Sequence, residues 1–185
     1  MAKGRAARAE KIEQTTISAG FLKIFGVGTL IVGDSGIGKS ESALELIARG
    51  HKFIADDVVR IRKAPGGGLR GSAPPLSRNF MEIRGLGIIN IREIFGPASV
   101  VGAARVDLII KLKHWRRGFE VDRLGLKASD EESILGVKVP QLAIPVAPGR
   151  NIATLIEVAC KVHILRERGY HAPSEIIKRL DRILT

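Results

Sequence analysis

Cysteine is almost absent from this sequence, because Cys160 is the only one in 185 residues. A single cysteine excludes an internal disulfide framework and a cysteine-based zinc cluster. Aromatic residues make up 4%, so the chain has few platforms on which single-stranded nucleic acid could stack, and it has no RNA-recognition or zinc-finger signature. It also lacks an apolar run long enough to span a bilayer and an N-terminal signal peptide. We therefore expect a cytoplasmic protein with no membrane segment, and these features do not favour nucleic acid as its partner.

Acidic residues are in the minority, with 19 Asp and Glu against 30 Lys and Arg and a net charge of +11. Such a balance favours an acidic partner, which could be a nucleotide, a nucleic acid, an acidic protein surface or an anionic membrane. We interpret most of the charge as a source of solubility and of attraction for an anionic ligand. Hydrophobic residues make up 45%, which is ordinary for a globular protein, so the length predicts one domain with a substantial core and tails.

A strand–loop–helix pattern lies at residues 29–40, which read T-L-I-V-G-D-S-G-I-G-K-S. A buried strand runs into the spacing G-x-x-x-x-G-K-S, and a helical pattern follows, as in a phosphate-binding P-loop. The glycines let backbone N–H groups turn toward an anion, and the helix directs its positive end to the same point. Lys39 would reach the β- and γ-phosphates, and the Ser40 hydroxyl would bind Mg²⁺. The residues expected to bind the nucleotide are Gly33, Asp34, Ser35, Gly36, Ile37, Gly38, Lys39 and Ser40.

Two adjacent carboxylates, Asp56 and Asp57, lie in the middle of a predicted strand at residues 52–62. Charged side chains are seldom buried unless they are paired or bind a metal. One of the two could hold Mg²⁺ and the other could accept a proton from an attacking hydroxyl. The alternative is a solvated bend between two short strands.

A second pair of charged residues, Glu82 and Arg84, lies on one face of a predicted hairpin at residues 81–91, M-E-I-R-G-L-G-I-I-N-I. They could form an ion pair on an edge strand, or they could supply a carboxylate for the metal and a guanidinium for phosphate. The sequence does not decide between these interpretations. Arg123, near a predicted turn, could likewise clamp a phosphoryl group or form a surface ion pair.

The remaining pattern predicts an α/β domain between two tails. A strand broken at Gly20 should form a hairpin with the P-loop strand at the edge of the sheet, and residues 134–146 should form two short strands. Helices are expected at residues 152–168 and 174–184, and the apolar stripe of the second could pack on a neighbouring subunit. The predicted units are a basic tail at 1–15, a catalytic domain at 16–170 and a C-terminal helix at 171–185.

Five motifs in order closely resemble HPr kinase/phosphorylase, the bacterial enzyme that phosphorylates a serine of the phosphocarrier protein HPr. The resemblance runs over residues 20–170, and E-I-R-G-L-G-I-I is far more specific than a P-loop. It implies an α/β fold of the HPr kinase and phosphoenolpyruvate carboxykinase type, with a mixed β-sheet, flanking helices and a C-terminal helical tail. The motifs are G-D-S-G-I-G-K-S, A-D-D, M-E-I-R-G-L-G-I-I-N, D-R-L-G and P-V-A-P-G-R-N-x-A-x-x-I-E-V-A.

The resemblance also implies roles. Residues 33–40 would hold the triphosphate of ATP, with Ser40 and Glu82 as Mg²⁺ ligands. Asp57 would accept the proton of the substrate serine with Asp56 beside it near the metal, although the two aspartates are not ranked firmly. Arg123 would be the catalytic arginine. Residues 144–149 would belong to the loop tied to dephosphorylation, in which phosphate attacks phosphoserine and yields pyrophosphate. A homo-hexamer, with the tail helix gripping the protein substrate, is implied as well.

The sequence departs from the family in two places. It lacks the usual N-terminal domain, and it reads Ser18-Ala19-Gly20 where the family has a catalytic histidine before glycine. The missing histidine weakens the expectation of phosphorylase activity. Our leading hypothesis is therefore a Mg-dependent protein-serine kinase of the phosphotransferase system that uses ATP, with pyrophosphate as a second candidate donor. The alternatives are a small-molecule kinase of the serine or threonine type and a non-catalytic regulator that senses nucleotide.

Overall fold

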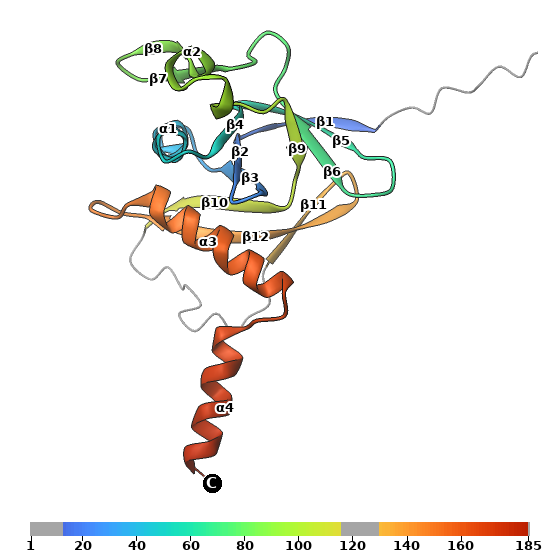
Figure 1. The fold of residues 1–185 in the computed structure, drawn as a ribbon, viewed down its shortest axis with the longest axis vertical. Coiled ribbons are helices and arrows are strands. Elements are labelled where there is room, and N and C mark those ends of the chain that lie inside the picture. Colours follow the sequence, from blue (N-terminus) through green and yellow to red (C-terminus); the bar gives the residue numbers. More distant parts are fainter. Residues whose placement is uncertain (1–12, 116–129, 185) are drawn as a thin grey trace, which may run out of the picture.

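The computed structural model describes residues 13–115 and 130–184 (Figure 1). A mixed six-stranded sheet forms its centre, with the strand order β11-β12-β10-β3-β2-β4. The strand β3 pairs parallel with β10 and antiparallel with β2, and β10 pairs parallel with β12. The strands of this sheet are β2 (Gly20–Ile24), β3 (Val27–Val32), β4 (Lys52–Ala55), β10 (Leu108–His114), β11 (Asp130–Ile134) and β12 (Val137–Val146).

Two smaller sheets accompany the central one. The first is antiparallel, with the order β1-β5-β6-β9, and the second is the hairpin of β7 and β8. Their strands are β1 (Gln14–Ser18), β5 (Val58–Lys63), β6 (Leu69–Ser72), β9 (Ala103–Arg105), β7 (Phe80–Ile83) and β8 (Gly87–Asn90). The helices are α1 (Lys39–Ala48), α2 (Ile91–Phe95), the 3₁₀ turn η1 (Pro97–Ser99), α3 (Ile152–Glu167) and α4 (Ala172–Leu184).

The central sheet buries both of its faces. Successive side chains of a strand point to opposite faces, so Ile31 of β3 packs with the helices α1 and α3, while its neighbour Leu30 packs against the four-stranded sheet. The same division separates Ile110 from Ile109 in β10. Central strands buried on both sides read as continuous apolar runs, which is why the strand before the P-loop was recognisable in the sequence.

The helix α4 extends away from the rest of the molecule (Figure 1). Its apolar residues Ile176, Ile177, Leu180 and Ile183 are exposed. The apolar stripe expected from the sequence is therefore present, and it has no covering element in the described part of the chain. In residues 13–115 and 130–184, no helix is long and apolar enough to cross a membrane.

Three expectations about strands were wrong. The hairpin of β2 and β3 forms, but β2 lies inside the sheet because β4 pairs with its other edge. Residues 52–62 are two strands in different sheets, since the chain turns at Asp56 and Asp57. Residues 137–146 form one long strand. It tolerates Pro145 because β11 pairs only with residues 137–141, so one edge of β12 has no described neighbour at the proline.

Candidate nucleotide-binding site

The loop between β3 and α1 has the backbone shape that an anion site requires. Gly33 has φ of 153°, and a Cβ atom there would lie 2.8 Å from the carbonyl oxygen of Leu112, so the position demands glycine. Gly38, in the left-handed region at φ of 101°, is the N-cap of α1 and offers no side chain to the first turn. The N–H groups of that turn therefore remain available to an external anion, next to the positive end of the helix.

Lys39 lies back over this loop. Its ammonium Nζ donates hydrogen bonds to the carbonyl oxygens of Gly33, at 2.9 Å, and Asp34, at 3.0 Å. A positive charge is thus held at the loop without a carboxylate partner among the described residues. This position suits a side chain that contacts phosphate.

The Ser40 hydroxyl points to the buried carboxylate of Asp56. Its Oγ donates to Oδ2 at 3.1 Å, with Oδ1 at 3.3 Å. Asp56 follows β4, which places it beside the first turn of α1, and its side chain is 8% exposed. Burial raises the pKa of this carboxyl, while hydrogen bonds from Ser40 and the Asp57 backbone act in the opposite direction.

Asp57 differs from its neighbour in conformation and exposure. It has φ of 63°, a left-handed geometry that Asp and Asn tolerate better than other residues with a side chain. This turn sends the chain from β4 into β5, and the Asp57 carbonyl accepts a hydrogen bond from the Ala19 N–H at 3.2 Å. The Asp57 side chain is exposed. The alternative of a bend between two short strands is therefore correct for the backbone, but only one of the two carboxylates is solvated.

The β7–β8 hairpin completes the site. It brings Glu82 and Arg84 to an open cavity of ≈ 280 Å³ that is also lined by Lys39, Ser40, Asp56 and Asp57. Arg84 approaches the loop closely: a Cβ atom placed on Gly36 would lie 3.8 Å from the Arg84 guanidinium. Segments at residues 35–41, 56–57 and 82–84 thus meet at one cavity.

Not every predicted residue lies in this cavity. Ile37 is 5% exposed and belongs to the hydrophobic core, so it supports the loop rather than the ligand. Ile144 and Pro145 line a different groove of ≈ 520 Å³, between β12 and α3. Arg123 lies outside the described residues. The catalytic and metal-binding roles expected for the described residues, including Asp56, Asp57 and Glu82, stay predictions.

Arg84 was a candidate from the sequence, but nothing in the sequence fixed its distance from the P-loop. Glu41 was not among the expected site residues, yet it lines the cavity beside Ser40. The available signal was its position in the first turn of the helix, where side chains lie next to the loop that precedes them.

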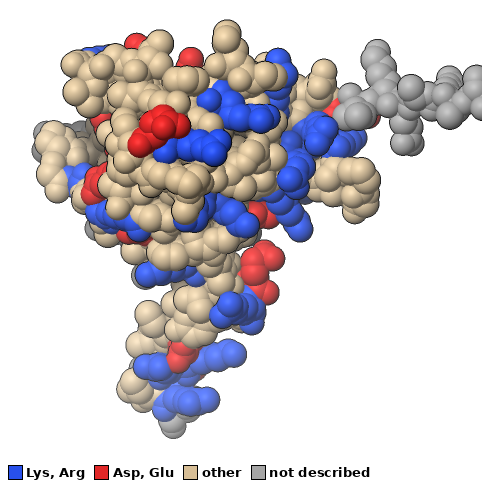
Figure 2. Space-filling view, turned by 45° about the horizontal axis from the view of Figure 1, so that its top comes forward, with Lys and Arg blue, Asp and Glu red and all other residues tan. Residues whose placement is uncertain are grey.

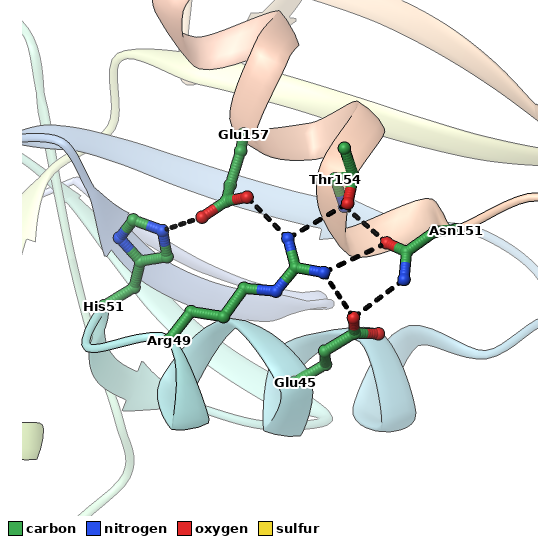
Figure 3. Close-up of polar contacts among 6 residues, drawn as sticks. All are labelled: Glu45, Arg49, His51, Asn151, Thr154 and Glu157. Carbon is green, nitrogen blue, oxygen red and sulfur yellow. Dashed lines mark hydrogen bonds and ion pairs between the residues drawn. The ribbon is translucent and has the colours of Figure 1, made fainter.

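A polar cluster anchors the far end of α1 to α3. Glu157 of α3 accepts hydrogen bonds from Arg49 Nη1, at 2.6 Å, and bonds His51 Nε2 at 2.8 Å. Burial raises the pKa of Glu157, but the hydrogen bonds from His51 and Arg49 outweigh it and hold that pKa below its usual value. The residues of the cluster are Glu45, Arg49, His51, Asn151, Thr154 and Glu157 (Figure 3).

The same cluster caps α3. The Asn151 side chain accepts the Thr154 N–H at 2.7 Å as the N-cap of the helix, and its amide donates to Glu45 at 2.8 Å. His51 is thus a structural residue next to the end of α1. Because α1 carries the P-loop at its other end, the cluster fixes the helix that positions Lys39 and Ser40.

The oxygen atoms at the cavity fit Mg²⁺ in type and number. Mg²⁺ usually takes one or two carboxylates together with substrate phosphates and water, rather than a full protein cage. Ser40, Asp56 and Glu82 supply one hydroxyl and two carboxylates. Among residues 13–115 and 130–184, no group of three or more His, Cys, Asp or Glu side chains is placed to hold a metal ion by itself. A site of this kind would depend on phosphate oxygens for its remaining ligands.

Comparisons with known proteins identify the family of this chain. A family model described as HPr Serine kinase C-terminal domain matches residues 10–180. A protein named HPr kinase/phosphorylase from Thermoanaerobacter sp. (strain X514) is 47% identical over 167 residues, covering 90% of this chain and 54% of the relative. HPr kinase/phosphorylase 1 from Oceanobacillus iheyensis is 45% identical over 170 residues, covering 92% of this chain and 54% of the relative. The chain spans about half the length of these relatives.

A solved structure gives the same fold. The structure titled "Structure of the Hpr(Ser) kinase/phosphatase from Coxiella burnetii" superposes with a TM-score of 0.79 at 37% sequence identity. The alignment covers 88% of this chain and 98% of that chain. The expected α/β fold with a mixed sheet, flanking helices and C-terminal helices is confirmed.

Proposed function

Because this chain belongs to the HPr serine kinase C-terminal domain family, we propose that it is an ATP-dependent kinase that phosphorylates a serine of HPr or a similar protein. The observation that carries this proposal is the convergence of Lys39 and Ser40 with four carboxylates and Arg84 at one cavity. Phosphoryl transfer needs such an arrangement, because its catalysis consists mainly of positioning and charge stabilisation.

In the proposed reaction the serine oxygen attacks the γ-phosphorus, the bond to the leaving oxygen of the diphosphate breaks, and the hydroxyl proton passes to Asp57. The exposed position of Asp57 leaves it accessible to an acceptor that enters the cavity. Lys39 and the N–H groups at the start of α1 stabilise the negative charge of the phosphates. Arg84, on the other wall, is placed to do the same.

Mg²⁺, held by Ser40, Asp56 and Glu82, would neutralise phosphate charge when bound. The hydrogen bond from Ser40 to Asp56 holds these two candidate ligands close together. The third candidate, Glu82, comes from β7, so a bound metal would also link the β7–β8 hairpin to α1. We infer that this hairpin forms the upper wall of the nucleotide site.

A protein acceptor fits an open site better than an enclosed one. The cavity opens to solvent, and Asp57 and Glu82 on its wall are exposed, so a serine on a protein surface could enter. Ala19 occupies the position before Gly20 where the resemblance places a histidine, and a methyl group cannot transfer a proton. We therefore propose that phosphorolysis of phosphoserine is slow relative to phosphorylation.

The proposal is tested by incubating the purified chain with labelled ATP, Mg²⁺ and HPr, and separately with a panel of small hydroxyl compounds that includes free serine and threonine. We expect label on HPr. Label on a small compound instead would identify a metabolite kinase. Nucleotide binding without transfer to any acceptor would identify a regulator.

Two variants assign the roles. Lys39→Ala should abolish transfer and leave the fold intact, and normal transfer by this variant would remove the P-loop from the mechanism. Asp57→Asn preserves the left-handed backbone, because Asn tolerates it as well as Asp, and should lower kcat by about 10²-fold or more while nucleotide still binds. Asp130→Asn on the edge strand β11 is the matched control and should behave as wild type.

A further inference from the structure

A row of arginines crosses the outer face of the four-stranded sheet, away from the nucleotide cavity. The register of the strands places Arg62 of β5 opposite Arg70 of β6, and Arg70 opposite Arg105 of β9. The inward-facing neighbours Ile61 and Leu69 belong to the core, so alternation along each strand sends the arginines outward.

This row is unfavourable as it stands. Like charges directly opposite each other destabilise a pair of antiparallel strands. Arg105 is balanced by Asp107, whose Oδ1 lies 3.1 Å from its Nε. Arg62 and Arg70 have no carboxylate partner among the residues that the structure describes. Glu13, which directly precedes β1, pairs instead with Lys63, at 2.6 Å.

The two arginines of this row that lack a carboxylate partner among the described residues, Arg62 and Arg70, line a groove. The groove has a volume of ≈ 540 Å³, which is within the range of small-molecule sites. Its walls carry Arg60, Arg62, Arg70 and Arg78, with the hydroxyl of Ser72 and the amide of Gln14 as neutral hydrogen-bonding groups. Figure 2 shows Lys and Arg side chains gathered on the molecular surface.

We propose that this groove is a second anion site, which binds a compact molecule carrying several phosphate groups. Guanidinium groups bind phosphate through paired N–H donors, and several of them converging on one groove select a ligand of high charge density. The lining residues include no aromatic side chain, so the groove lacks the stacking surface with which proteins hold single-stranded nucleic acid. The inference is independent of the kinase proposal, because the groove shares no lining residue with the nucleotide cavity.

The site is tested by NMR titration of the ¹⁵N-labelled chain with two probes, inositol hexakisphosphate as a phosphorylated ring and inorganic tripolyphosphate as a linear chain. We expect both probes to change the amide chemical shifts of residues 60–62, 70–72 and 101–103. The probe with the lower dissociation constant shows whether the groove prefers a phosphorylated ring or a linear polyphosphate. The amides of residues 33–40 report separately on the nucleotide cavity. Shifts confined to 33–40 would overturn the proposal.

Two double variants distinguish binding at this groove from non-specific attraction to the positively charged surface. Arg62→Ala with Arg70→Ala should weaken groove binding at least tenfold, and its Tm without ligand should equal or exceed that of wild type because the opposed charges are gone. Arg168→Ala with Arg182→Ala removes the same charge from the C-cap of α3 and from α4 and should leave the affinity unchanged. Equal weakening in both would overturn the proposal. So would an oligonucleotide that shifts the same amides at lower concentration than either probe.

Discussion

The ionic cluster between α1 and α3 predicts a large effect of replacing Glu157 by alanine. The substitution removes the partner of His51 Nε2, a ring that is 7% exposed and has little access to water. A buried polar group left without a hydrogen bond costs about 1–3 kcal/mol. Arg49 is more accessible and keeps its second contact with Glu45, so we assign it no part of this loss. We expect the free energy of unfolding of Glu157→Ala at pH 7 to fall by about 1–3 kcal/mol.

The pH dependence of this effect has a defined sign. The folded protein holds the pKa of Glu157 below its value of 4.5 in the unfolded chain, since the hydrogen bonds from His51 and Arg49 outweigh the effect of burial. A lowered pKa contributes stability above the unfolded value, and that contribution disappears as the pH falls through the folded value. The difference between wild type and Glu157→Ala should therefore shrink below pH 4.5.

Urea denaturation followed by far-UV circular dichroism measures both effects. Glu157→Gln keeps an oxygen acceptor for His51 and should lose less stability than the alanine variant. Glu132→Ala, on the exposed strand β11, controls for the loss of any glutamate and should shift the midpoint little. A midpoint for Glu157→Ala that matches Glu132→Ala at pH 7 would refute the reasoning. A difference from wild type that grows in acid would refute the assigned sign.

Three further outcomes follow from single positions. Gly33→Ala should destabilise the fold more than Gly66→Ala, because both have positive φ but only Gly33 meets a carbonyl, that of Leu112; equal melting temperatures would contradict this. Burial raises the pKa of the Cys160 thiol to about 11, so at pH 8 roughly 0.1% is thiolate, and a disulfide reagent should react quickly only after unfolding. Asp56→Asn removes a buried charge whose pKa burial has raised. An acid whose pKa is raised by folding destabilises the folded state as the pH rises through that pKa, so at pH 7 Asp56→Asn should have a midpoint urea concentration equal to or higher than that of wild type. The same variant should lose Mg²⁺-dependent nucleotide binding.

The P-loop could be predicted from the sequence because all of its requirements lie within twelve consecutive residues. The strand, the glycines, Lys39, Ser40 and the helix are neighbours in the chain, so local geometry determines their relation. The β7–β8 hairpin was predictable for the same reason, since its turn and both strands lie between residues 80 and 90.

Features that depend on pairing between distant segments could not be predicted. The opposition of Arg62 and Arg70 depends on the β5–β6 register, and a shift of one residue would send one of them into the core. The cluster around Glu157 joins residues more than a hundred positions apart in the chain. Glu82 likewise reaches the P-loop through the packing of the β7–β8 hairpin near α1, which no local pattern encodes.

The turn between β4 and β5 shows why the two adjacent aspartates need not share a role. The chain must leave the central sheet after Ala55 and enter the four-stranded sheet at Val58, so two residues make the change of direction. Asp56 keeps its side chain buried beside the first turn of α1, where the Ser40 hydroxyl donates a hydrogen bond to it. Asp57 has a left-handed backbone conformation, and its side chain is exposed to solvent. A buried carboxylate next to a hydroxyl suits a metal ligand, whereas an accessible one suits proton transfer with an incoming acceptor. The strand break therefore produces two different chemical environments from one repeated residue, and it does so beside the loop where the phosphates are expected.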